Sequence, residues 1–117
     1  MAIARNFEDL ECWKLARLTC AEIYKLTLME PFQKDYDLRS QIRRSATSIM
    51  SNIAEGFDRQ SPLQRAYFMK IAIGSAGETR SHLFLATDLG YTNENTRKQL
   101  DNDIKSIIRQ INGFIRK

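Results

Sequence analysis

Apolar residues recur at steps of four and three along residues 37–57. At about 100° per residue, this spacing gathers them into one narrow stripe, which is typical of a helix that packs on a core. A second line, well around the same helix, is wholly polar. The stripe contains Leu38, Ile42, Ala46, Ile49 and Ile53, and the polar line contains Gln41, Arg44, Ser48, Asn52 and Glu55. We expect Gly56 to end this helix as a left-handed cap.

A helix over residues 7–28 precedes it. Asn6 can cap its start, and Pro31 closes it, because proline disfavours a helical conformation at the residue before it. The connection that follows carries Phe32 and Tyr36, which we expect to pack over the end of the bundle.

Two more helices follow residues 37–57. Ser61 and Pro62 together give a strong start signal for a helix over residues 62–89, which Gly90 ends. Thr92 or Asn93 caps a fourth helix over residues 93–116. No strand pattern, repeat or low-complexity segment is found, and the connections are short. The sequence therefore predicts an all-α, antiparallel up-down four-helix bundle, formed by residues 1–117 as a single domain.

The predicted third helix, over residues 62–89, is apolar around more than half of its circumference. A surface helix of a monomeric bundle shows one stripe, so this helix is predicted to be either central or part of a subunit interface. Gly74 and Gly77 lie in its middle, where each costs about 1 kcal/mol relative to alanine. We expect them to allow the close approach of another helix backbone.

Composition narrows the choice of function only slightly. The chain has 117 residues, a net charge of +4 and a pI near 9.3, without any block of five like charges. This charge fits a slightly basic solvated surface as well as a nucleic-acid footprint. No apolar run approaches the roughly 20 residues needed to span a membrane, and residues 1–6 lack the apolar block of a signal peptide. We therefore expect a cytoplasmic protein.

Candidates for catalysis or metal binding are few. Cys12 and Cys20 lie eight residues apart on one predicted helix, about 12 Å along its axis, which is too far for a disulfide. Glu55, Glu78 and His82 are the only plausible metal ligands, and the Glu-x-x-His pairs of di-metal bundles are missing. We predict no metal, no cofactor and no enzymatic activity.

Glu78 lies within an apolar line of the third helix, between Ile71 and Leu85. A carboxylate placed there needs a partner, which Arg43, Arg44 or the amide of Asn52 could supply. A structural network, a ligand-binding role and plain solvent exposure all remain open.

The arginines are the candidates for phosphate contacts, because the guanidinium fork suits phosphate. Arg43 and Arg44 point about 100° apart, so we expect that they cannot both serve one face, whereas Arg39 and Arg43 share a side. Other basic side chains follow on the connection and the third helix. They are Arg59, Arg65, Lys70 and Arg80. A salt-bridged, solvated surface would use the same residues.

Several segments together resemble the bacterial four-helix-bundle family that is encoded by intervening sequences within 23S ribosomal RNA genes. The most specific is Asn-Ile-Ala-Glu-Gly at 52–56, and the resemblance covers nearly the whole chain. One departure is that Pro31 precedes Phe32, where proline often follows the phenylalanine. The matching segments are 7–10, 13–16, 36–46, 48–56, 68–78 and 89–91.

The resemblance implies a left-handed up-down bundle that commonly assembles as a homopentameric ring. Related accessory proteins of diversity-generating retroelements bind nucleic acid and a reverse transcriptase. No catalytic residues are carried over. A closed ring needs two different complementary faces on each subunit, which agrees with the broadly apolar third helix.

We therefore expect a non-enzymatic oligomer, with a pentamer favoured, that binds structured RNA or DNA through phosphate contacts. The alternative is a ring-shaped scaffold for a protein partner, whose basic residues are merely solvated. The predicted contact residues are Arg39, Arg43, Arg44, Arg59, Arg65 and Lys70, and the predicted structural or interface polar residues are Asn52, Glu55 and Glu78.

Overall fold

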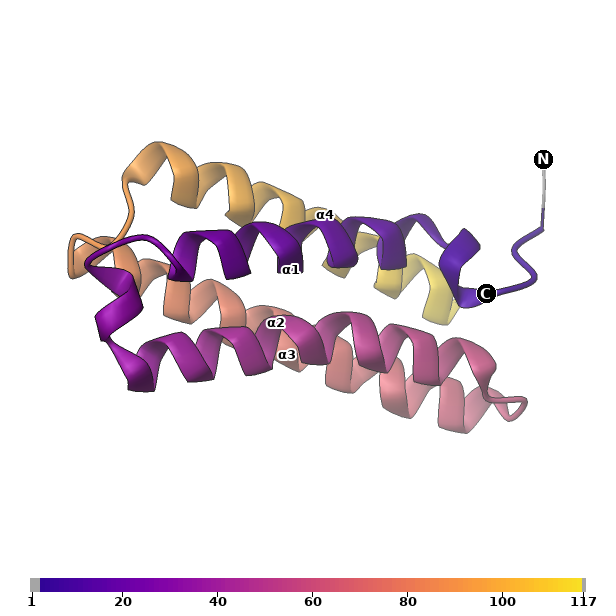
Figure 1. Cartoon of the computed structure of the whole chain (residues 1–117). Helices are drawn as coiled ribbons and strands as arrows, with labels where there is room; N and C mark the ends of the chain where they lie inside the picture. The colour runs from indigo at the N-terminus through magenta and orange to yellow at the C-terminus, as the bar shows by residue number, and fades with distance from the viewer. Residues whose placement is uncertain (1–2, 117) are drawn as a thin grey trace.

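The chain forms four α-helices, as the sequence predicts, in a computed structural model that describes residues 3–116. The helices are α1 (Glu11–Thr27), α2 (Tyr36–Asp58), α3 (Pro62–Asp88) and α4 (Glu94–Arg116), and Figure 1 shows them side by side as one elongated bundle. The remainder of the predicted domain 1–117, namely Met1, Ala2 and Lys117, lies outside the described residues. None of the helices in the described part is long and apolar enough to cross a membrane.

Neighbouring helices run in opposite directions. Ser48 and Ser75 meet across α2 and α3, as do Ser45 and Thr79, so a position earlier on α2 pairs with one later on α3. The colour order along the helices in Figure 1 shows the same reversal from α1 to α2 and from α3 to α4. The short connections permit this up-and-down path. The left-handed turn of the bundle stays a prediction.

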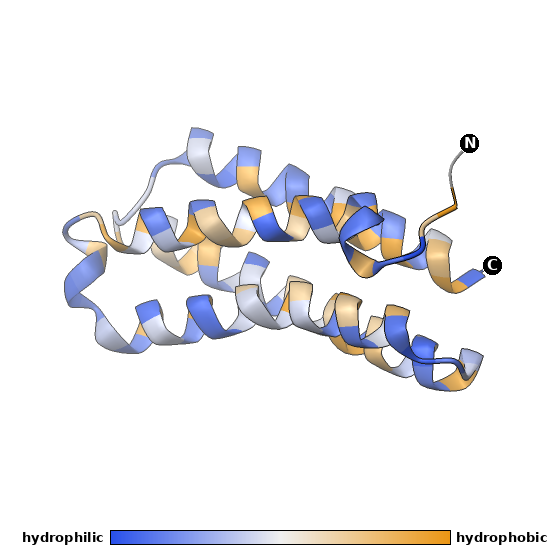
Figure 2. Ribbon diagram, turned by 45° about the vertical axis from the view of Figure 1, so that its right-hand side comes forward, coloured by the Kyte–Doolittle hydropathy of each residue, from blue (hydrophilic) through white to orange (hydrophobic). Residues whose placement is uncertain are grey.

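The core fills the space between the four helices. Hydrophobic and hydrophilic residues alternate along each helix (Figure 2), as expected for helices with one face against a core. The largest fully buried apolar side chains come from every helix and from the first connection. They are Phe32, Ile23, Ile42, Ile49, Ile53, Met69, Leu83, Ile104, Ile107 and Ile111.

The first helix begins later than predicted. A 3-10 turn, Phe7–Asp9, is followed by Leu10 in an extended conformation, and α1 starts only at Glu11. The Asp9 carboxylate accepts the backbone N–H of Asn6, and the ring of Phe7 packs edge-on against Trp13. These contacts fold the segment back onto α1. The prediction of a continuous helix from residue 7 was therefore wrong.

Caps mark the later helix starts and one helix end as expected. Ser61 Oγ accepts the N–H of Gln64 at the start of α3, and Asn93 Oδ1 accepts the N–H of Thr96 at the start of α4. Gly90 has a positive φ of 77°, which glycine adopts without strain, and it ends α3. Tyr36, expected over the bundle end, is instead exposed at the start of α2.

Gly56 has a different role from the predicted one. It lies inside α2, which continues to Asp58, and its φ is not positive. A Cβ built there would lie 3.2 Å from the carbonyl oxygen of Arg65 and 3.2 Å from Cβ of Phe68. Gly56 therefore allows α2 and α3 to approach closely, the function that the sequence had suggested for Gly74 and Gly77. Those two glycines meet nothing within 4 Å in the single chain.

Candidate nucleic-acid interface

The predicted basic residues fall into two groups at different ends of α2. Arg39, Arg43 and Arg44 lie on its first half, whereas Arg59 follows its last turn. Twenty residues of helix separate Arg39 from Arg59, which is about 30 Å along the axis. The six predicted contact residues therefore do not form one patch, and each group needs its own account.

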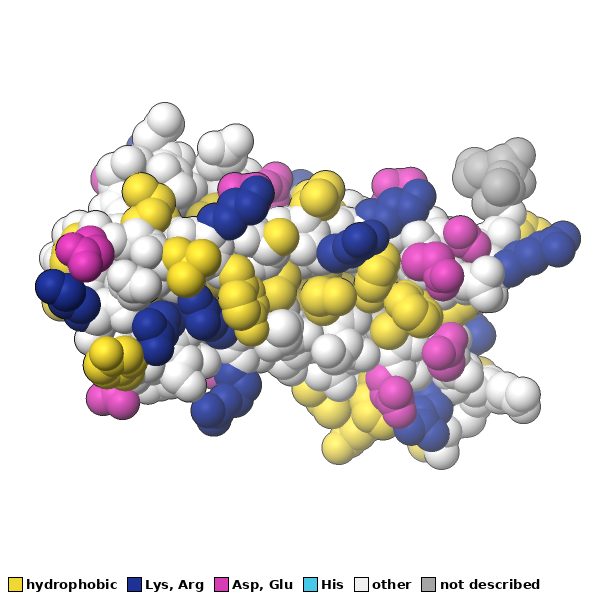
Figure 3. Space-filling view, viewed as in Figure 1, with side chains coloured by type: hydrophobic (Ala, Val, Ile, Leu, Met, Phe, Trp, Pro, Cys, Tyr) yellow, Lys and Arg dark blue, Asp and Glu magenta, His cyan; other side chains and the backbone are white. Residues whose placement is uncertain are grey.

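The first group surrounds an open hollow of about 410 Å³ on the α1–α2 side of the bundle. Figure 3 shows Lys and Arg side chains gathered over the first half of α2, beside a row of hydrophobic side chains along the α1–α2 boundary. The hollow is lined by Tyr24, Arg39, Ser40, Arg43, Arg44 and Thr47. We call it the arginine hollow.

Two of its arginines are held in place by neighbours. Nε of Arg43 donates to Thr27 Oγ1 at 2.8 Å, and its guanidinium lies 4.6 Å from the ring centroid of Tyr24. Nη1 of Arg39 donates to the carbonyl of Gln33 at 2.8 Å, and its guanidinium lies 4.7 Å from the ring centroid of Tyr36. Such cation–π contacts orient a guanidinium without neutralising it.

Arg44 completes the hollow, although the sequence had suggested that Arg43 and Arg44 could not serve one face. Nη2 of Arg44 lies 3.4 Å from Ser40 Oγ, so its side chain bends back along the helix. The helix does point the two Cβ atoms about 100° apart. An arginine side chain is long enough that both residues still line the same hollow, so this prediction was wrong.

None of the three arginines has a carboxylate partner among the residues that the structure describes. Within residues 3–116, no Asp or Glu oxygen lies within 4.0 Å of the charged nitrogens of Arg39, Arg43 or Arg44, whereas several other basic residues do form ion pairs. Three positive charges that line one hollow without an internal anion favour an external one.

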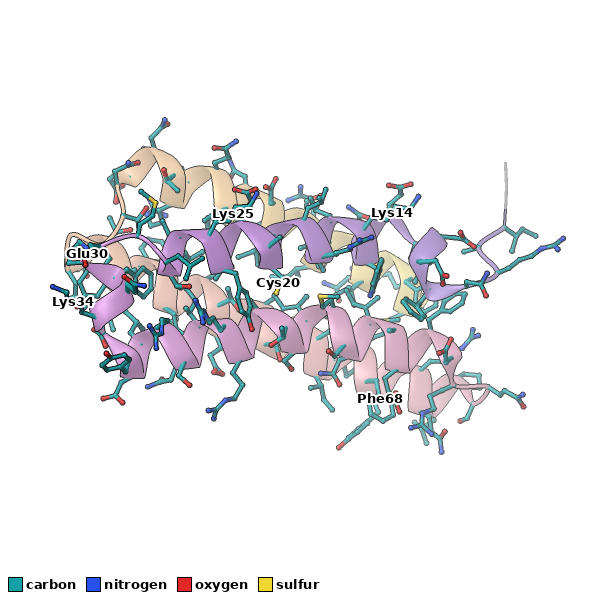
Figure 4. All side chains as sticks on the ribbon, viewed as in Figure 1. Lys14, Cys20, Lys25, Glu30, Lys34 and Phe68 are labelled. Carbon is teal, nitrogen blue, oxygen red and sulfur yellow. The ribbon has the colours of Figure 1, made fainter. Side chains whose placement is uncertain are left out.

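The second group is mostly engaged in holding the α2–α3 connection. Arg59 forms an ion pair with Glu55 and lies over the ring of Phe68, which Figure 4 labels on α3. Arg65 donates from Nε to the carbonyl of Arg59 at 2.5 Å and from Nη2 to the carbonyl of Phe57 at 3.3 Å. Lys70 is exposed on α3. Arg59 and Arg65 thus have intramolecular partners that the sequence does not reveal.

The polar line of α2 borders α3. Ser48 and Ser75 share a hydrogen bond of 2.7 Å, and Nδ2 of Asn52 donates to the carbonyl and hydroxyl oxygens of Ser48. Asn52 is half-buried and Glu55 is exposed in the single chain. The line therefore lies at the outer edge of the α2–α3 contact, and only its middle reaches α3.

Glu78 meets none of the partners suggested for it. Its side chain is 56% exposed, and Oε1 lies 3.6 Å from Nε2 of His82. The apolar line that contains it faces away from the core, since Ile71 and Leu85 are also exposed. Among residues 3–116, no three His, Cys, Asp or Glu side chains come together as possible metal ligands.

A charged cluster on α3 and α4 went unrecognised in the sequence. Asp101 is almost fully buried, with Arg80 Nε at 2.6 Å and Lys105 Nζ at 3.3 Å from its carboxylate oxygens. Burial raises the pKa of Asp101, but the hydrogen bonds from Arg80 and Lys105 outweigh it, so this pKa lies below the ordinary value of 3.8. Asp101 directly follows Leu100, which belongs to the buried apolar face of α4. Its position beside that face is the only feature of the sequence that indicates its burial.

Because the folded-state pKa of Asp101 is lowered, its contribution to stability is present above pH 3.8 and is lost as the pH falls through the folded-state value. We expect Asp101→Asn to lower the free energy of unfolding by about 1–2 kcal/mol at pH 7 and by less at low pH. Urea titrations at pH 7 and at a pH below 3.8 measure this difference in the free energy of unfolding. Asp58→Asn, at an exposed position, is the control, and an equal loss at every pH would contradict the assignment.

The sequence profile of the family described as 23S rRNA-intervening sequence protein matches residues 8–113. The chain belongs to this family. Among solved structures it is similar to a Bacteroides thetaiotaomicron protein, determined at 1.70 Å resolution and described as a protein with unknown function from the S23 ribosomal protein family. The two chains share 28% sequence identity over 91% of this chain and 96% of the other, with a TM-score of 0.82.

Membership of the 23S rRNA-intervening sequence protein family confirms the resemblance seen in the sequence, and the structural similarity agrees with the four-helix architecture. No curated protein matches the chain. The suggested relation to the accessory proteins of retroelements stays a prediction.

Proposed function

We propose that this family member is a non-enzymatic protein that binds the phosphate backbone of nucleic acid in the arginine hollow. The observation that carries the proposal is that Arg39, Arg43 and Arg44 line one hollow and have no carboxylate partner within the described chain. Arginine binds phosphate through two parallel N–H···O bonds, so the arrangement suits a phosphate anion.

We further propose that the protein is an oligomer, with a pentamer favoured, joined through the outward face of α3. Support comes from apolar side chains that are exposed along that face. Glu78 and Gly74, which has open space around it, lie on the same face. Isolated exposed apolar side chains are common, but several of them along one helix face favour an interface. The row consists of Leu63, Tyr67, Ile71, Leu85 and Leu89. Several hollows on one assembly would raise the affinity for a long nucleic acid.

The proposal is tested by replacing Arg39, Arg43 and Arg44 together with glutamine. We expect affinity for a structured ribosomal RNA fragment at low salt to fall about 10- to 100-fold, because two or three phosphate contacts are lost. The slope of log affinity against log salt should flatten by roughly 2 to 3 units. Fluorescence anisotropy across a salt series measures both, and light scattering of the wild type gives the assembly mass.

The matched control replaces Lys14, Lys25 and Lys98 with glutamine, which removes the same net charge from exposed positions on α1 and α4. Figure 4 labels Lys14 and Lys25. Equal losses in the two variants would mean that only net charge matters. Because Arg43 also contacts Thr27, the double variant of Arg39 and Arg44 checks that misfolding is not the cause.

The second candidate function is a protein-binding scaffold, favoured by the same exposed row on α3. It predicts an oligomer whose mass does not change with RNA at any salt concentration. It also predicts that the arginine variant behaves like the lysine control.

A further inference from the structure

We propose that the arginine hollow, if it binds phosphate as argued above, takes an unpaired stretch of nucleic acid rather than a duplex, with one base stacked on Tyr36. The inference deepens the proposed function, and it depends on three features: the shortness of the basic segment, the carboxylates at its end, and the tyrosines beside it.

The basic segment is short. Arg39 and Arg44 are five residues apart, which is about 7.5 Å along the helix axis. After Arg44, the next charged residue on α2 is Glu55. A duplex carries one charge per roughly 1.7 Å of its axis and gains affinity from a long basic surface. The hollow offers room for only two or three phosphates.

Two carboxylates lie just before the basic segment in the sequence. Asp37 is exposed on the first turn of α2, and Asp35 is fixed by accepting hydrogen bonds from the N–H of Leu38 and the hydroxyl of Tyr91. A straight, rigid duplex that followed α2 through the hollow would bring its phosphates towards these carboxylates, and like charges repel. A single strand can bend away after two or three phosphates.

Tyrosine rings supply a surface for the bases. Tyr36 is 69% exposed and lies one helical turn before Arg39, whose guanidinium lies over its ring. Tyr24, on the α1 side of the hollow, is 38% exposed and carries Arg43 in the same manner. Unpaired bases stack on tyrosine rings and on guanidinium planes, whereas the bases of a duplex keep their faces covered by each other.

Tyr36 thus offers stacking at the start of α2, and Arg43 and Arg44 offer phosphate contacts about two turns further on. Arg39, which lies over the ring of Tyr36, serves both purposes, since its planar guanidinium can stack and its N–H groups can bind phosphate. A nucleotide in an unpaired loop matches this order, with its base at Tyr36 and the adjoining phosphates in the hollow.

The test compares Tyr36→Leu with the wild-type protein by fluorescence anisotropy. The probes are a uridine-rich RNA of about 12 nucleotides and the same strand annealed to its complement. We expect the wild type to prefer the single strand. Tyr36→Leu should weaken single-strand binding about 5- to 20-fold, at the lower end of the range for one stacked base, and change duplex binding less than twofold.

Three controls make the result specific. Tyr36→Phe should keep the affinity, because stacking needs the ring and not the hydroxyl. Leu18→Ala, at an apolar side chain that is 64% exposed on α1 and outside the apolar row of α3, should have no effect. A DNA strand of matching sequence should lose affinity by the same factor as RNA, and a loss confined to RNA would overturn the stacking assignment.

Equal affinity of the wild type for the two probes, or an equal loss of both in Tyr36→Leu, would overturn the inference while leaving phosphate binding intact. Failure of the proposed function looks different, since the wild type would then bind neither probe even at low salt.

Discussion

Phe32→Ala is expected to lower the free energy of unfolding by about 3–5 kcal/mol, as for other fully buried aromatic residues. Phe32 is 0% exposed although it belongs to the connection between α1 and α2. Its ring stacks on Tyr91, from the connection between α3 and α4, at a centroid distance of 5.0 Å. It therefore joins the two connections at one end of the bundle, and its removal leaves a cavity that helix packing cannot easily close.

Urea titration of the variant and the wild type at one protein concentration measures this loss. Leu18→Ala is the matched control, because Leu18 is 64% exposed on α1 and its truncation should change stability by no more than about 0.5 kcal/mol. A loss below about 1 kcal/mol for Phe32→Ala would mean that this end of the bundle repacks.

Arg65→Met is expected to cost about 2–4 kcal/mol of stability, with little effect on affinity for nucleic acid. Arg65 donates two hydrogen bonds to the carbonyls of Phe57 and Arg59, and charged donors of this kind contribute about 1.5–3 kcal/mol each when buried. Partial exposure of Arg65 reduces the sum. Without the guanidinium, both carbonyls lose this partner where α2 ends and α3 begins.

Lys70→Met is the control, since it removes the same charge from an exposed position that lies further along α3. Thermal melting reports stability, and anisotropy with the single-stranded probe reports binding. If Arg65→Met melts like the wild type but loses much of its affinity, Arg65 belongs to the binding surface. That result would contradict its structural role.

The helices were predictable because each has a clear apolar period and recognisable caps. Ser61 and Asn93 satisfy backbone donors locally, so neighbouring residues determine where α3 and α4 start. The break at Leu10 depends on the packing of Phe7 against Trp13. The role of Gly56 was mispredicted for a related reason. The sequence around a glycine does not distinguish a helix end from a contact with a neighbouring helix.

The candidate site was predictable only in part. Arg39 and Arg65 are equivalent as sequence, yet one lines an open hollow and the other binds two carbonyls. That difference arises from the neighbouring chain segments. Tyr24 belongs to the apolar pattern of α1, and it reaches the hollow because it stands at the edge of that pattern, next to the buried Ile23.

The third helix shows the same limit. Its apolar residues cover two faces, and the sequence could not say which one packs inside the subunit. The structure turns Met69, Ala72, Ala76 and Leu83 inward and leaves Tyr67 and Leu85 outward. Small alanines on the inner face agree with the close approach of α2, whereas the bulkier outward side chains keep much of their surface exposed.

Both ends of the described chain lie at the same end of the bundle, and the arginine hollow lies on the half of α2 nearer the other end (Figure 1). The bundle is 43 Å long. A protein immobilised on a sensor surface through a tag at either terminus would therefore keep the hollow directed towards the flowing solution. Reactive handles for cross-linking at the termini would, by the same geometry, lie far from the arginine hollow.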